Sequence, residues 1–216
     1  MTEGNAATAP PSRRQGRRQE RWRKWRGEAL QLAMVALVVL AARSSLADHY
    51  VIPSGSMEYT LLPGDHVFVD KLAYGLRVPF TDWRLSAGDA PARGEVVIFD
   101  SPEDGTRLIK RVVAVAGDVV SIVDGELMID GRSARASGGR PIEVVGGHVA
   151  DLNLSFGGGV DLAPTAIAEG TVLVVGDARG NSRDGRFFGA VDADSIYGKA
   201  DGVIYRRGEG LVWRPL

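Results

Sequence analysis

The chain of 216 residues contains no cysteine, which excludes a disulfide framework, a thiolate zinc site and a cysteine nucleophile. Histidine is scarce: His49, His66 and His148 lie far apart and lack the spacing of metal ligands. We therefore expect no zinc site. Long helical patterns are missing after residue 47, where short β-type runs are divided by Gly, Pro and Asp. This pattern predicts a mostly β domain over residues 48–216.

The charge is distributed unevenly, although the formal net charge is only −1. Eight Lys or Arg residues lie between Arg13 and Arg26, against the single Glu20, and the rest of the chain carries an acidic excess. Such an arm suits nucleic acid or an anionic lipid surface. Residues 1–26 lack a periodic apolar pattern, so we expect a disordered basic arm.

The apolar run that follows the arm favours lipid over nucleic acid as its partner. Residues 29–42 are apolar except for Gln31, and as a helix they would extend roughly 21 Å, short of the roughly 30 Å hydrocarbon core. Continuing the helix to about residue 46, with Arg43 snorkelling, closes most of that gap. The basic flank then predicts a transmembrane helix over residues 27–47 with the arm in the cytoplasm.

A cleavable signal peptide explains the same N-terminus equally well, because Ser45-Leu46-Ala47 fits the small-x-small cleavage pattern. The mature chain would then begin at Asp48 and could be a secreted β-rich binding protein. A core helix bearing a nucleic-acid-binding arm is a third interpretation, which lacks a helical partner downstream.

Alternating apolar residues predict several strands in the β domain. The clearest local structure is a hairpin, because Asp124-Gly125 separates Val119–Val123 from Glu126–Asp130 and tolerates the positive φ of a tight turn. Residues 131–170 are Gly-rich and poorly periodic, which predicts a small, loop-rich insertion. The remaining predicted strands are His66–Leu72, Glu95–Phe99, Leu108–Val115 and Thr171–Val175.

Two serines two residues apart, Ser54 and Ser56, directly follow the apolar segment. Alone, Ser-Gly-Ser is typical of a turn, but the segment resembles the nucleophile box of bacterial type I signal peptidases, with Ser56 at the nucleophile position. Three later segments resemble the other family boxes in the right order. The matching residues are Pro53-Ser-Gly-Ser-Met57, Thr60-Leu61 and Gly64-Asp65; Lys71-Leu-Ala-Tyr-Gly75 and Pro79; Arg93-Gly-Glu-Val-Val-Ile-Phe99, Ile109-Lys-Arg111 and Gly117-Asp118; and Gly176-Asp177, Arg179, Asn181-Ser-Arg-Asp184, Arg186 and Gly189.

This resemblance makes Lys110 the general base of a Ser–Lys pair. A lysine accepts a proton only when neutral, so its pKa must fall from about 10.4 towards 7, which costs about 4.6 kcal/mol and is within the range of buried lysines. Alternation does not distinguish Lys110 from Arg111, since both have apolar neighbours on their faces. Arginine, however, does not lose its proton at accessible pH, and the family position is that of Lys110.

The resemblance also implies the remaining roles. The Ser54 hydroxyl and the Ser56 N–H would form the oxyanion hole, Ser182 would hydrogen-bond the Lys110 amine, and Asp184 and Arg186 would support it as an ion pair. The substrate would bind as an added strand, with small side chains in shallow pockets. The residues expected to line these pockets are Tyr50, Ile52, Met57, Leu61 and Ile109.

The function implied by the resemblance is cleavage of signal peptides from exported preproteins by a single-pass enzyme of the bacterial inner (plasma) membrane, with its catalytic domain outside the cytoplasm. It needs no cofactor, no nucleic acid and no obligate protein partner; its partners are signal peptides and membrane lipid. A self-cleaving Ser–Lys repressor would require a helix-turn-helix, which the sequence lacks. The chain departs from the family pattern at Tyr59, Ala178, Gly180 and Gly185.

Overall fold

The computed structural model describes residues 22, 25–35, 47–75, 86 and 88–216. The chain divides into two compact units, Met1–Arg43 and Ser44–Leu216. Within the first unit, residues 25–35 form a helix. The transmembrane helix predicted over residues 27–47 extends over residues 36–46, which lie outside the described part of the chain, as does most of the basic arm. Across the described residues, no helix has both the length and the apolar character needed to cross a membrane.

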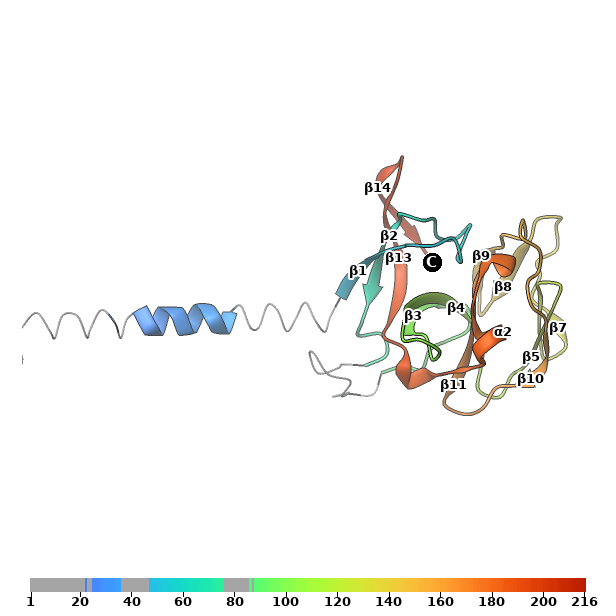
Figure 1. The fold of residues 1–216 in the computed structure, drawn as a ribbon, viewed down its shortest axis with the longest axis horizontal. Helices are drawn as coiled ribbons and strands as arrows, with labels where there is room; N and C mark the ends of the chain where they lie inside the picture. The colour runs from blue at the N-terminus through green and yellow to red at the C-terminus, as the bar shows by residue number, and fades with distance from the viewer. Residues whose placement is uncertain (1–21, 23–24, 36–46, 76–85, 87) are drawn as a thin grey trace, which may run out of the picture. The chain divides into compact units, whose positions relative to one another are not determined.

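The second unit is built on an eight-stranded antiparallel sheet (Figure 1). Its strand order is β1-β2-β13-β3-β4-β11-β12, and β14 pairs with β13. The penultimate strand β13 thus lies between β2 and β3. The bounds are β1 (Ala47–Val51), β2 (His66–Asp70), β3 (Val96–Asp100), β4 (Arg107–Val115), β11 (Thr171–Val175), β12 (Val191–Asp192), β13 (Gly198–Arg206) and β14 (Gly210–Pro215).

The central strands are buried on both faces, which explains why their sequences read as nearly continuous apolar runs. In β3, Val96 and Ile98 pack in one core cluster, while Val97 and Phe99 pack in another. By contrast, β2 alternates between buried and half-buried residues. The two cores fix β3 and its neighbour β4 at the centre of the unit.

A smaller sheet carries the predicted hairpin. Asp124 and Gly125 have φ values of 49° and 79°, as the tight turn requires, and this prediction is confirmed. The sheet has the strand order β10-β5-β6-β7. Its strands are β5 (Val119–Val123), β6 (Glu126–Ile129), β7 (Arg132–Ser133) and β10 (Leu162–Ala166).

The insertion is more ordered than its sequence indicates. It contains β7, β10 and a second hairpin, β8 (Ile142–Val145) and β9 (His148–Asp151), which turns at Gly146-Gly147 with φ of 58° and 85°. Residues 131–170 therefore contain short strands that were not predicted, although most of the segment lies outside strands. A Gly-Gly pair between apolar residues is a hairpin signal, so the sequence did contain this information.

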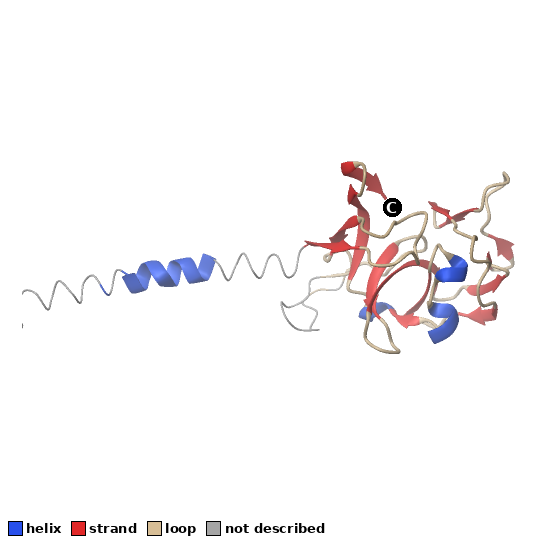
Figure 2. Cartoon of the chain, turned by 45° about the horizontal axis from the view of Figure 1, so that its top comes forward, coloured by secondary structure: helices blue, strands red, loops and turns tan. Residues whose placement is uncertain are grey.

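Strands predominate in residues 88–216, where the helices are single turns (Figure 2). They are η1 (Arg179–Asn181), α2 (Gly185–Phe188) and η2 (Ala193–Ser195). The first two follow β11 directly, and with the serine-containing loop after β1 they provide most of the candidate site. The expectation of a mostly β domain of antiparallel sheets is confirmed, while β1, β13 and β14 were not among the predicted strands.

Candidate active site

Ser56 and Lys110, which are 54 residues apart in the sequence, meet in the interior of the second unit. Lys110 Nζ lies 2.7 Å from Ser56 Oγ and donates to the Ile109 carbonyl at 3.0 Å. Lys110 is 2% exposed and Ser56 is 8% exposed. The two groups are within the hydrogen-bond distance that general-base activation of a hydroxyl by a neutral amine requires.

Burial lowers the pKa of Lys110 to about 8, against the charges of Asp184 and Asp177, which raise it. No carboxylate of the described residues forms a salt bridge with its amine. An ammonium here would lose its hydration without gaining a counterion. The environment therefore raises the neutral fraction of the amine near neutral pH, compared with that of a solvated lysine.

Arg111, the next residue on β4, is also buried, but its charge is neutralised. Its Nε and Nη2 bind Asp177 Oδ1 and Oδ2 at 3.0 and 2.8 Å, and its Nη1 donates to the Gly94 carbonyl at 2.7 Å. Thr60 Oγ1 donates to the same carboxylate at 2.5 Å. The alternation of apolar residues in the sequence did not distinguish Lys110 from Arg111. In the structure the Arg111 guanidinium is paired with a carboxylate, whereas the Lys110 amine contacts a serine hydroxyl.

Backbone contacts connect the serine loop to the segment that follows β11. The Ala178 N–H donates to the Ser56 carbonyl at 3.1 Å. A Cβ on Gly176 would lie only 2.5 Å from that carbonyl and 2.2 Å from Ser182 Oγ. A residue without a side chain is therefore required at position 176, because Ser56 and Ser182 both pack against it.

Ser182 does not make the hydrogen bond expected of it. Its Oγ is buried and has no hydrogen-bond partner among the described residues. The Lys110 amine is instead engaged by the Ile109 carbonyl and Ser56 Oγ. The expectation that Ser182 binds the Lys110 amine is not met in this structure.

Asp184 and Arg186 form a fully buried ion pair, with both Nε–Oδ1 and Nη2–Oδ2 distances of 2.9 Å. Asp184 also caps α2 and accepts the Gly176 N–H at 2.9 Å. Arg186 donates to the Gly158 carbonyl at 2.8 Å. The pair therefore fixes the end of β11, where Gly176 packs against Ser56.

The other predicted site residues lie around the dyad with different exposure. Ser54 is exposed and its Oγ lies 3.5 Å from Ser56 Oγ, the outer limit of a hydrogen bond. Ile52, Met57 and Leu61 belong to one buried core cluster, against which Tyr50 and Ile109 pack half-buried. Met57 and Leu61 are fully enclosed, so their lining of a substrate pocket stays a prediction.

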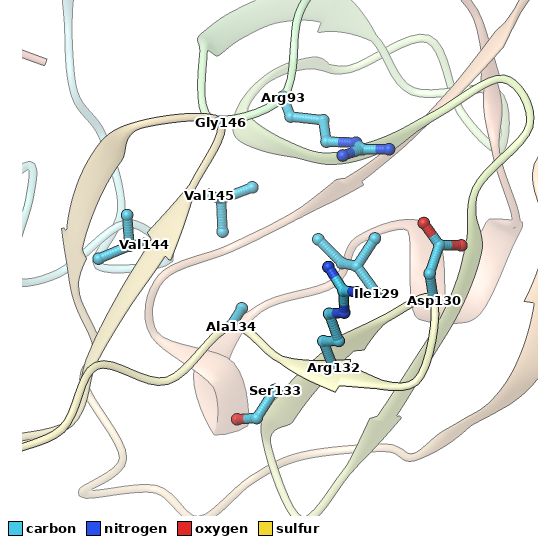
Figure 3. A pocket seen from close by; sticks show the side chains of 9 residues that line it. All are labelled: Arg93, Ile129, Asp130, Arg132, Ser133, Ala134, Val144, Val145 and Gly146. Atoms are coloured by element: carbon cyan, nitrogen blue, oxygen red, sulfur yellow. The ribbon is translucent and has the colours of Figure 1, made fainter.

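A polar cavity of about 230 Å³ lies elsewhere in the unit, between the small sheet and the β8–β9 hairpin (Figure 3). Arg93 and Arg132 project beside it, and Asp118 binds Arg93 Nε at 2.6 Å. None of the predicted site residues lines this cavity. The chemistry of Ser56 and Lys110 is therefore separate from it.

Sequence reasoning assigned no role to several buried or half-buried polar groups around the site. Thr60, Arg111 and Asp177 occur in the family-like segments, which was a usable signal. Glu143 and Asn153, both buried, belong to the insertion, and no sequence motif pointed to either of them. Glu143 binds Arg179 through both carboxylate oxygens, at 3.1 and 2.5 Å.

Comparison with known proteins identifies the family. The family model described as signal peptidase, peptidase S26, matches residues 25–205. Signal peptidase I of Pseudomonas fluorescens is 34% identical over 194 residues, covering 78% of this chain and 68% of the relative. Signal peptidase I of Aquifex aeolicus is 29% identical, covering 85% of each chain.

Among solved structures, a signal peptidase I from Enterococcus faecalis V583 is 26% identical, with a TM-score of 0.36, and the match covers 51% of this chain and 97% of that one. The family match alone spans most of the sequence. The chain therefore belongs to the bacterial type I signal peptidases, serine peptidases of family S26.

Proposed function

We propose that the protein is a membrane-bound endopeptidase that removes N-terminal signal peptides from exported preproteins through an acyl-enzyme on Ser56, with Lys110 as the general base. The observation that carries this proposal is the 2.7 Å contact between Lys110 Nζ and Ser56 Oγ, with the amine buried. Arginine is excluded as the base, because Arg111 stays charged and paired with Asp177.

In the proposed reaction, neutral Lys110 takes the proton of Ser56 as Oγ attacks the scissile carbonyl. The Ser54 hydroxyl and the Ser56 N–H donate to the developing oxyanion. The protonated Lys110 then gives its proton to the leaving amine, and water hydrolyses the ester with Lys110 again as base. With a pKa of about 8, about a tenth of the amine is neutral at pH 7.

The remaining polar residues have supporting roles in this proposal. Ser182 Oγ, a buried hydroxyl without a hydrogen-bond partner in the described part of the chain, is available to orient the Lys110 amine once Ser56 has been acylated. Asp184 and Arg186 hold the segment that bears Ser182. A buried polar atom without a partner is rare in native proteins, which supports a functional reason for Ser182.

The substrate is proposed to bind in extended form. β1 contains Tyr50 and lies at one edge of the large sheet, where it pairs with β2 alone among the described strands, so an added strand could pair with its outer side. Tyr50, Ile52, Met57, Leu61 and Ile109 would shape shallow apolar pockets. Pockets of this kind accept small side chains at the first and third positions before the cut.

The proposed location is the inner (plasma) membrane, crossed once by residues 27–47, with the basic arm in the cytoplasm and residues 48–216 outside it. Signal peptides and lipid are then the partners, and the chemistry requires no metal, organic cofactor, nucleic acid or obligate protein partner. N-terminal sequencing of the mature protein tests the anchor, because retention of residues 1–26 supports it and a start at Asp48 rejects it.

Cleavage of a model preprotein in detergent tests the mechanism. Ser56→Ala removes the nucleophile and Lys110→Met removes the base while keeping an apolar side chain of similar length, so both should abolish cleavage. Lys199→Met is the matched control, since Lys199 is a partly exposed lysine paired with Glu95 and should leave activity unchanged. Wild-type activity in either dyad variant contradicts the proposal.

A further inference from the structure

Asn153, which follows β9 in the insertion, contacts both loops that form the candidate site. It is only 4% exposed. Its Nδ2 donates to Glu58 Oε2 at 3.0 Å, and its backbone N–H donates to the Asp177 carbonyl at 3.0 Å. Its Oδ1 accepts the Ser155 N–H at 2.9 Å. Both polar atoms of the side chain are therefore engaged in a hydrogen bond, which restricts its rotamer.

Glu58 carries this contact to the serine loop. The Glu58 N–H donates to the Gly55 carbonyl at 3.1 Å, and its carboxylate lies over Gly55, where an added Cβ would be 2.9 Å from Oε1. Gly55 separates Ser54 from Ser56. Fixing the Glu58 side chain therefore restricts the backbone turn that sets the direction of the Ser56 hydroxyl.

Asp177 carries the second contact to the lysine side of the site. Its carboxylate is held by Arg111, which adjoins Lys110 on β4, and the next residue, Ala178, donates its N–H to the Ser56 carbonyl. An isolated antiparallel bridge between Leu152 and Tyr59 adds a further connection beside Asn153. Two consecutive residues of the insertion, Leu152 and Asn153, thus contact the serine loop and the segment that contains Asp177.

We propose that Asn153 is a positioning residue, which aligns Ser56 with Lys110 by tying Glu58 to the Asp177 segment. This inference rests on the proposed function, since it concerns the same serine and lysine. An amide is suited to the position because it donates to a carboxylate and accepts a backbone N–H at once. An aspartate would place two carboxylates against each other and release Glu58 from Gly55.

The test measures kcat and KM for preprotein cleavage by full-length variants in detergent. Asn153→Asp should lower kcat about 10- to 100-fold, the effect of a small misplacement of reacting groups, with KM changed less than about twofold. The double variant Glu58→Gln/Asn153→Asp reverses the direction of the hydrogen bond and should recover most of the lost kcat. A merely structural role would not give such rescue.

Two further variants keep the test decisive. Glu58→Ala removes the same contact from the more exposed partner and should lower kcat to a similar extent, even if Asn153→Asp folds poorly. Asp151→Ala, two residues from Asn153 in an exposed ion pair with Arg140, is the matched control and should leave kcat unchanged. Thermal unfolding of each variant shows which ones are folded.

The inference is overturned if folded Asn153→Asp and Glu58→Ala retain wild-type kcat, or if the double variant recovers nothing. Ser56→Ala separates this failure from failure of the proposed function. If Ser56→Ala is inactive while the Asn153 and Glu58 variants are fully active, only the positioning role is rejected. If Ser56→Ala retains activity, the proposed function itself is rejected.

Discussion

Lys110→Met should stabilise the protein at neutral pH, because the buried amine carries an unfavourable charge there. Burial depresses the pKa of Lys110 from 10.5 to about 8. In the unfolded chain the lysine binds its proton with the higher pKa, so folding is penalised wherever that proton is bound. The depression corresponds to about 3 kcal/mol at any pH below about 8.

The sign and the pH window follow from these two pKa values. Below about pH 8 the folded and unfolded chains are both protonated at Lys110 and the full penalty applies. Between about pH 8 and 10.5 the unfolded chain binds more protons, so the free energy of unfolding rises with pH as the penalty disappears. Methionine has no charge and removes this dependence, although it also loses the contacts with Ser56 Oγ and the Ile109 carbonyl, about 1 kcal/mol each.

Urea denaturation of both proteins in detergent, followed by circular dichroism from pH 6.5 to 10.5, measures the difference. The wild type should gain about 3 kcal/mol relative to Lys110→Met across this range, whatever the constant contribution of the lost contacts. Lys199→Met is the control of opposite sign: burial opposes its charge, but Glu95 and Asp201 outweigh burial and raise its pKa. Parallel pH curves for wild type and Lys110→Met would refute the reasoning.

Three other predictions concern activity. The kcat/KM of the wild type should rise about tenfold per pH unit up to about pH 8 and then level off. Asp184→Asn should move the rising part of this pH profile to lower pH, because it removes a charge that raises the pKa of Lys110. A kcat/KM that does not change with pH from 6 to 9 contradicts this prediction. Ser182→Ala should lower kcat about tenfold without loss of thermal stability, since the hydroxyl it removes has no hydrogen-bond partner among the residues that the structure describes, and unchanged kcat would exclude the orienting role. Gly176→Ala should abolish cleavage and lower the melting temperature, because its Cβ would collide with the Ser56 carbonyl and Ser182 Oγ; normal activity and melting would show that this packing is dispensable.

Much of the large sheet was predictable because its strands are either continuous apolar runs or bounded by turn residues. Thr171–Val175 agrees with β11 residue for residue, and Leu108–Val115 differs from β4 only by Arg107. β13 escaped prediction because Gly198, Gly202 and charged residues interrupt its apolar pattern. Its stability as a strand comes from pairing with β2 and β3, which a local pattern does not encode.

The candidate site, like the sheet, was predictable from the sequence only in part. Chemistry and family resemblance together select Ser56 and Lys110, since few residue types serve as nucleophile and base. The contacts of Asn153 and Glu143 depend on how the insertion folds back against β11, and neither residue belongs to a motif. The burial of Lys110 could not be predicted from the sequence either. The alternation of apolar residues fits Arg111 as well, and only tertiary packing buries both side chains.

The position of β13 has a consequence for how the enzyme comes into being. The serine loop adjoins β2, the lysine lies on β4, and in the sheet β13 stands between β2 and β3. A ribosome-bound chain that has not yet released residues 198–206 lacks the strand that joins these two halves. In the described sheet, the half that adjoins the serine loop and the half that contains Lys110 are therefore connected through a strand that is synthesised after both.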